Sequence, residues 1–132
     1  MFRKLIRICM AFALFALLAG FGSGTPIYNA TAVPIPQAQA PTLDGIEKAI
    51  VRAGLQLGWK IAPQGPGKAE GVLAIRTHTA IVDITYDTKS YSIVYKSSVN
   101  LSYDERTKTI HSNYNGWIRN LEKAINVQVS VL

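Results

Sequence analysis

Apolar residues recur at every third or fourth position in two stretches of the chain, the spacing that lines one face of an α-helix. The first stretch follows Thr42, a residue type that caps helix N-termini, and stops before Gly58, a residue type that ends helices. It predicts a helix over about 43–57. The second stretch predicts a helix over about 113–126, with Ser112 or Asn113 as its cap.

Between the two predicted helices the apolar period changes to two, which is typical of β-strands. The alternation predicts a strand over 59–64, a turn at Gly65-Pro66-Gly67, and strands over 70–77, 80–86 and 91–97. A phosphate-binding loop at these glycines would need a Lys-Ser/Thr pair and a helix start after them. A hairpin turn is therefore favoured.

The predicted strands can be paired so that one face of the sheet is apolar throughout. A two-residue turn at His78-Thr79 would place Ile75 opposite Val82. A four-residue loop after Tyr86 would place that residue opposite Tyr91. Both hairpins then keep the same face inward, which predicts an antiparallel meander.

These elements predict an α+β fold, a two-layer sandwich in which a four- or five-stranded antiparallel meander carries the N- and C-terminal helices on one face. A polar turn over 104–107 and a short return strand to Ile110 would add the fifth strand. Val127, Val129 and Val131 alternate, and this leaves the tail open between strand, frayed helix and irregular end.

The N-terminal region has the order of a secretory signal, basic and then apolar. Three cations precede fourteen residues, Ile8 to Phe21, that carry no charge. A signal core takes roughly 7 to 15 apolar residues, whereas a membrane-spanning helix takes about 20. Residues 1–24 are therefore predicted to be a signal peptide, with an uncleaved N-terminal anchor as the alternative. Either one predicts export, to the periplasm or to the outer side of the inner membrane.

Residues 25–40 are rich in proline and alanine and predict an extended linker, so that the folded domain would span 41–132. Signal-peptide cleavage needs small residues two positions apart. Such pairs include Gly22/Gly24, Ala30/Ala32 and Ala38/Ala40. The first lies at the most natural distance from the apolar run.

Composition and charge narrow the class of protein further. The 132 residues are 48% hydrophobic and 17% charged, which excludes an intrinsically disordered chain. One cysteine excludes an internal disulfide framework and a zinc site built from cysteine pairs. The net charge of +6 falls to +3 over 41–132, where eleven Lys/Arg stand against eight Asp/Glu. The folded region is therefore only mildly basic, and its charge gives little reason to expect nucleic-acid binding.

Catalytic and metal-ligating groupings are not visible in the sequence. His78 and His111 are its only histidines, and they have neither zinc-ligand nor catalytic-triad spacing. His78 is expected in a hairpin turn. We therefore predict no catalytic residue, no metal site and no cofactor.

Five tyrosines lie between residues 86 and 114 and would suit a stacking surface for bases or sugars. The alternation instead turns Tyr86, Tyr91 and Tyr95 toward the helices, which predicts core packing with hydroxyls at the rim. The densest polar and aromatic run, 110–117, predicts a strand-to-helix corner, where a binding site would have donors, acceptors and rings together. The candidate residues are Tyr103, His111, Asn113, Tyr114, Asn115 and Trp117.

Two resemblances follow from particular motifs. Leu18-Ala19-Gly20 resembles the run before the lipidated cysteine of bacterial lipoprotein signals, and Phe21 stands where that cysteine would be. Further motifs cover most of residues 43–125; they include Gly58-Trp59, Tyr91-Ser92-Ile93-x-Tyr95, Asn100-Leu101-x-Tyr103 and the run from Ile110 to Leu121. They resemble a group of small uncharacterised bacterial envelope proteins, often predicted lipoproteins. That resemblance implies export and a shared fold, and it implies no activity.

Three hypotheses for function follow from the sequence. The first is an exported envelope protein that acts as a non-catalytic binding or accessory module for an envelope protein or a small ligand, and that contacts the membrane if its N-terminal segment stays attached. The second is a small envelope hydrolase with His111 as its base. The third is weak nucleic-acid binding, whose signature would be salt-dependent affinity.

Overall fold

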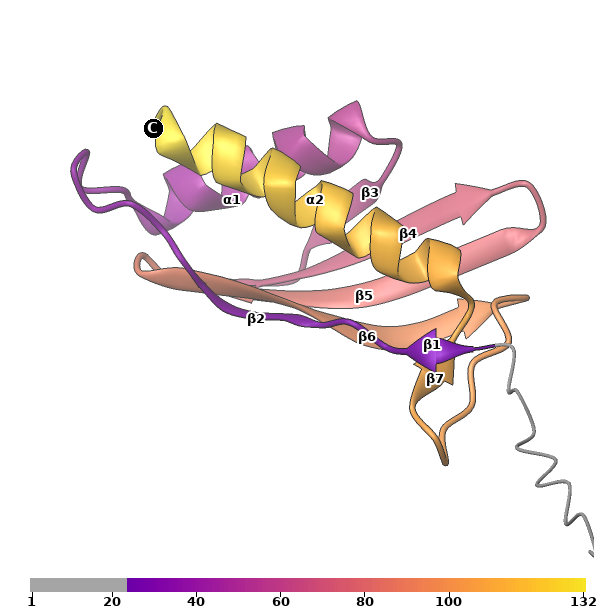
Figure 1. Cartoon of the computed structure of the whole chain (residues 1–132). Coiled ribbons are helices and arrows are strands. Elements are labelled where there is room, and N and C mark those ends of the chain that lie inside the picture. Colours follow the sequence, from indigo (N-terminus) through magenta and orange to yellow (C-terminus); the bar gives the residue numbers. More distant parts are fainter. Residues whose placement is uncertain (1–23) are drawn as a thin grey trace, which may run out of the picture.

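The computed structural model describes residues 24–132, and residues 1–23 of the predicted leader, with the Leu-Ala-Gly-Phe run, lie outside the described residues. The described part has two helices and seven strands (Figure 1). The helices are α1 (Leu43–Gln56) and α2 (Ser112–Ser130), and the strands are β1 (Thr25–Pro26), β2 (Ala30–Pro34), β3 (Lys60–Pro63), β4 (Lys68–Ile75), β5 (His78–Tyr86), β6 (Ser90–Val99) and β7 (Thr109–Ile110).

The strands form an antiparallel five-stranded sheet in the order β2-β6-β5-β4-β3 and a small sheet of β1 with β7. Both helices lie on one side of the large sheet and pack against each other (Figure 1). The predicted α+β class is confirmed. The meander runs from β3 to β6, and its fifth strand is β2 from the N-terminal end of the chain, which joins at the β6 edge. The prediction that the return strand to Ile110 is the fifth strand is wrong, because β7 pairs with β1 instead.

Helix α1 forms where the apolar period predicts it. Its cap is Thr42, whose Oγ1 accepts a hydrogen bond from the Gly45 backbone N–H at 3.0 Å. Gly58 follows the helix with φ +82°, a left-handed conformation that glycine adopts without a Cβ clash. The buried face of the helix is Ile46, Ala49, Ile50, Ala53 and Gly54.

Helix α2 is longer than predicted at its C-terminal end. Its cap is His111 and neither Ser112 nor Asn113, because the His111 ring accepts the Asn113 backbone N–H. The helix continues to Ser130, since Ile125, Val129 and Leu132 extend its apolar stripe onto the core. The alternation of valines in the tail therefore does not form a strand.

The predicted turn between β4 and β5 is displaced by two residues. The turn residues are Arg76 and Thr77, Arg76 has φ 55°, and His78 pairs with Ile75 as the first residue of β5. Val82 consequently lies opposite Gly71 instead of Ile75. The turn moves by two residues and each pairing partner by four; this even shift leaves every side chain on its predicted face, so the apolar alternation cannot detect it.

The pairing of β5 with β6 is the one that the sequence predicts at the hairpin end, with Tyr86 opposite Tyr91 and Ile84 opposite Ile93. Further along, Val82 pairs with Tyr95 but Ile81 pairs with Ser97, which leaves Lys96 as the extra residue of a bulge. The inward tyrosines have their predicted role: Tyr86 and Tyr91 are buried, and their hydroxyls bond to Glu47 and Asn126.

The predicted linker over 25–40 is wrong for residues 25–35, which we call the N-terminal strap. Its strand β2 pairs with β6, and Ala30 and Ile35 are only 1% and 3% exposed within the core. The folded unit therefore includes the strap and does not begin at residue 41. Proline and alanine misled the prediction because an edge strand tolerates both: β2 has a bulge and ends at Pro34.

Candidate functional site

The corner predicted from residues 110–117 is a real strand-to-helix junction, but its side chains separate into an inner group and an outer group. Tyr114 points into the core and is fully buried. Asn115 faces the strap: its Oδ1 accepts from the Tyr28 backbone N–H at 2.8 Å, and its Nδ2 donates to the Pro26 carbonyl at 2.9 Å. Neither residue is available to a ligand.

Three of the tyrosines form an aromatic cluster beneath this corner. The rings of Tyr95 and Tyr103 stack at 4.1 Å between centroids, and Tyr114 meets Tyr95 edge-on at 5.7 Å. The Tyr114 hydroxyl has no hydrogen-bond partner, and its burial raises the pKa of this phenol above its usual range. The Tyr103 hydroxyl donates to Glu105, which raises the pKa of Tyr103 in turn. The three rings pack against one another and the core, and Tyr103 lies at the edge of the cluster.

The outer group is His111 and Trp117, and the structure adds His78 to it. The ring centroids of His78 and His111 are 6.2 Å apart, and those of His78 and Trp117 are 6.4 Å apart. All three side chains are half-buried. We call these three residues the imidazole–indole corner. Asn113 is exposed beside it, and its backbone N–H serves the helix cap.

The hydrogen bonds of the two histidines define what they offer to a ligand. The Nδ1 atom of His78 lies 2.6 Å from the Asn100 carbonyl, which only accepts, so this nitrogen carries the proton and Nε2 keeps a lone pair. The Nδ1 atom of His111 accepts the Asn113 N–H at 3.2 Å, so the neutral ring carries its proton on Nε2. One imidazole is thus an acceptor and the other a donor.

An apolar groove begins at Trp117 and follows the C-terminal end of α1 along α2. Its first part is a hollow of about 70 Å³ lined by Leu57, Trp59, Leu73, Ile75, Trp117 and Asn120. Its second part, of about 280 Å³, is lined by Gln56, Leu57, Asn120, Lys123, Ala124 and Val127. Leu57, Ile75 and Val127 are 40%, 36% and 58% exposed, so large apolar side chains here are in contact with water.

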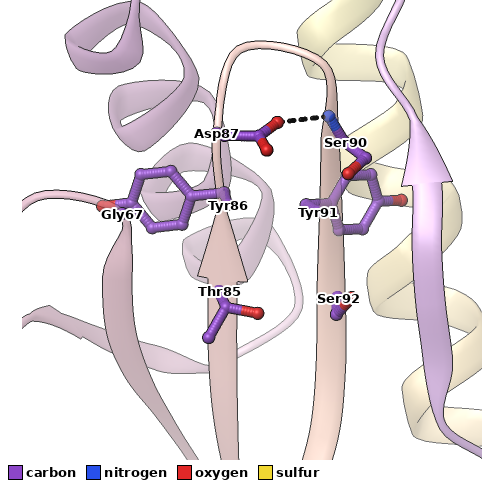
Figure 2. Close-up of a pocket in the computed structure, with 7 residues that line it drawn as sticks. All are labelled: Gly67, Thr85, Tyr86, Asp87, Ser90, Tyr91 and Ser92. Carbon is purple, nitrogen blue, oxygen red and sulfur yellow. Dashed lines mark hydrogen bonds between the residues drawn. The ribbon is translucent and has the colours of Figure 1, made fainter.

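A second hollow, of about 190 Å³, lies at the end of the β5–β6 hairpin (Figure 2). Its one carboxylate, Asp87, already accepts the backbone N–H groups of Lys89 and Ser90 at 2.7 and 2.8 Å, and these bonds lower the pKa of Asp87. The remaining lining offers the hydroxyls of Thr85, Ser90 and Ser92. The Asp87 carboxylate stabilises the turn through these bonds, so the charged group of this hollow is already occupied by backbone N–H groups.

A third hollow, of about 510 Å³, lies between the start of α1 and the turn that joins β3 to β4. Glu47 accepts the Tyr86 hydroxyl at 2.8 Å, and Asp44 pairs with Lys48 at 2.9 Å. The turn over 65–67 closes the hairpin as predicted, with the Gln64 N–H bonded to the Lys68 carbonyl. Both carboxylates are committed to neighbours within the fold.

These sites offer apolar surface and hydrogen-bonding groups to a ligand. Among residues 24–132, no three His, Cys, Asp or Glu side chains come close enough together to hold a metal ion. Within the same residues, neither helix is long and apolar enough to cross a membrane. On the uncovered face of the sheet, Lys96 pairs with both Glu70 and Asp83, at 2.7 and 3.7 Å. This face carries charges of both signs.

The sequence indicated part of the candidate site and missed the rest. His111 and Trp117 were identified by their place in a polar aromatic run, whereas His78 and the lining residues Leu57, Leu73 and Ile75 were not. The displaced β4–β5 turn moves His78 out of a loop and into a strand end, opposite Ile75 and beside α2. No sequence pattern connects residue 78 with residues 111 and 117. No family model, curated protein or solved structure matches this chain.

Proposed function

We propose that this protein is an exported cell-envelope protein and a non-catalytic binding module, and that its ligand is an apolar segment of another envelope protein. The imidazole–indole corner and the apolar groove form the binding face. The groove carries the binding part of the proposal, because it holds exposed Leu57, Ile75 and Val127 next to hydrogen-bonding groups. An apolar hollow with a few polar groups at its edge is the usual composition of a binding site.

Export is supported by the N-terminal sequence. Cations followed by fourteen uncharged residues have the order and length of a signal peptide. Resemblance to small bacterial envelope proteins supports the same location, in the periplasm or tethered outside the inner membrane.

The polar groups of the site support a peptide as the ligand. A backbone amide has one donor and one acceptor, which complement the His78 Nε2 lone pair and the His111 Nε2 proton. An apolar side chain of the same segment would enter the hollow beside Trp117. Lys123 and Asn120 at the groove edge would bind polar groups that flank it.

Export is tested by fractionating cells that produce the full chain and measuring its location by immunoblot. We expect the protein in the periplasmic or the membrane fraction, and not in the cytoplasm. A full-length chain recovered only from the cytoplasm would overturn the proposal.

Binding is tested by site-specific photocrosslinking in intact cells. A benzoylphenylalanine at position 57 lies in the groove, and the same residue at position 83 lies on the uncovered face of the sheet as the matched control. We expect a discrete crosslinked envelope protein from position 57 and none from position 83, with the Trp117→Ala variant reducing the product severalfold. Equal crosslinking from both positions would reject the groove as the binding face.

A further inference from the structure

We infer that the chain is processed at the bond between Gly24 and Thr25, and neither after Ala32 nor after Ala40. This inference rests on the proposed export. Ala30/Ala32 and Ala38/Ala40 satisfy the cleavage pattern in sequence, but a cut after Ala32 or Ala40 would remove part or all of the N-terminal strap. The strap is built into the domain.

The first half of the strap is held by backbone and side-chain hydrogen bonds to distant parts of the chain. Thr25 pairs with Ile110, and the Ile27 N–H donates to the Lys108 carbonyl at 2.9 Å. The Tyr28 hydroxyl donates to Glu122 at 2.5 Å, and the Arg119 guanidinium lies 3.9 Å above the Tyr28 ring. A cut after Ala32 would separate all of these contacts from the domain.

The second half closes the edge of the sheet. The Asn29 Oδ1 accepts the Tyr95 N–H at 2.9 Å beside the β6 bulge, and the Ile35 N–H donates to the Lys89 carbonyl at 2.8 Å. Ala30 and Ile35 fill the core. Without β2, the edge of β6 would expose unpaired backbone groups above an uncovered core, which promotes aggregation. Figure 1 shows the strap along β6.

These contacts begin at Thr25, which is the first residue of β1. A cut after Gly24 therefore leaves every contact of the strap in place. It also places the mature N-terminus at the β1–β7 end of the domain.

The test is the intact mass of the exported full-length chain and of two matched variants. Gly22→Leu places a bulky residue in the first small-residue pair, and Ala38→Leu does the same in the third, at an exposed position. We expect the exported wild-type chain and Ala38→Leu to begin at Thr25, and Gly22→Leu to accumulate as uncleaved precursor.

The contrary outcomes separate a failure of this inference from a failure of the proposed export. An exported product that begins at Ser23, Val33 or Pro41 would overturn the inference and leave export intact. An exported but uncleaved wild-type chain would do the same and favour the anchor. An unprocessed chain in the cytoplasm would overturn both the inference and the proposed function.

Discussion

Asn115 is the side chain that fastens the N-terminal strap to α2. Its amide makes hydrogen bonds with the Tyr28 N–H, the Pro26 carbonyl and the Thr25 hydroxyl, whereas the side chain of neighbouring Asn113 is exposed. We expect Asn115→Ala to lower the free energy of unfolding by about 1–3 kcal/mol, because it leaves strap groups without partners. Urea denaturation measures this change. Asn113→Ala is the control and should change it by less than about 0.5 kcal/mol; equal effects would contradict the fastening role.

Tyr114 and Tyr91 are both buried, and their hydroxyls differ in partners. The Tyr91 hydroxyl bonds to Asn126 Oδ1 at 2.7 Å, and that of Tyr114 has none. We expect Tyr114→Phe to be neutral or to stabilise the fold by up to about 1 kcal/mol, and Tyr91→Phe to destabilise it by a similar amount. Thermal unfolding of the two variants checks the opposite signs. A loss of stability in Tyr114→Phe as large as that in Tyr91→Phe would refute this account.

Helices α1 and α2 each contain a glycine that the helix period alone cannot explain, Gly54 and Gly116. A Cβ on Gly54 would lie 2.4 Å from Ile61 Cγ1, so the close approach of α1 to β3 requires this glycine. A Cβ on Gly116 would meet nothing within 4 Å. We expect Gly116→Ala to stabilise the protein by about 0.5–1 kcal/mol and Gly54→Ala to destabilise it by about 1–3 kcal/mol. Chemical denaturation of the pair checks both signs, and a destabilised Gly116→Ala would be the contrary result.

The pairing of strands shows how far local patterns reach. Tyr86 lies opposite Tyr91 as predicted, because the short loop between them limits the possible registers. Between β4 and β5 the predicted register is wrong, although each side chain stays on its predicted face. The turn lies elsewhere because Arg76 adopts a left-handed conformation, which is uncommon for arginine and cannot be predicted from its residue type. Alternation fixes the face of a strand, and its partner residue depends on the turn.

The tyrosines make the stability of the whole domain depend on pH in the alkaline range. Burial raises the pKa of Tyr91 and Tyr114, and the hydrogen bond to Glu122 raises that of Tyr28, above the value of about 10 in an unfolded chain. Above pH 10 the unfolded state therefore releases protons that the folded state keeps. Stability from these residues is complete below about pH 10 and is lost as pH rises toward the folded-state pKa values.

We expect the free energy of unfolding to fall above about pH 10, and phenolate absorbance to rise later in the folded protein than in urea-unfolded chain. Spectrophotometric titration of both states makes the comparison. Coincident titration curves would show that the phenols are not protected by the fold.

The folded domain as a whole is larger at its N-terminal end than composition suggests. Proline and alanine over 25–40 gave no apolar period, and Ala30 and Ile35 enter the core only because β6 offers them an open edge. The candidate site has the same origin. His78 meets His111 and Trp117 because a strand end and a helix start converge, which no local pattern encodes.

By itself the sequence determined the α+β class, the start of α1, the inward faces of β4, β5 and β6 and the buried role of Tyr86 and Tyr91, since these depend on spacing within a segment. Only the tertiary structure decided that the strap pairs with β6, how far α2 extends and which residues of β4 and β5 lie opposite each other. It also decided that His78 lies beside His111 and Trp117. Each of these depends on contacts between residues far apart in the chain, whose energies appear only when distant segments are brought together.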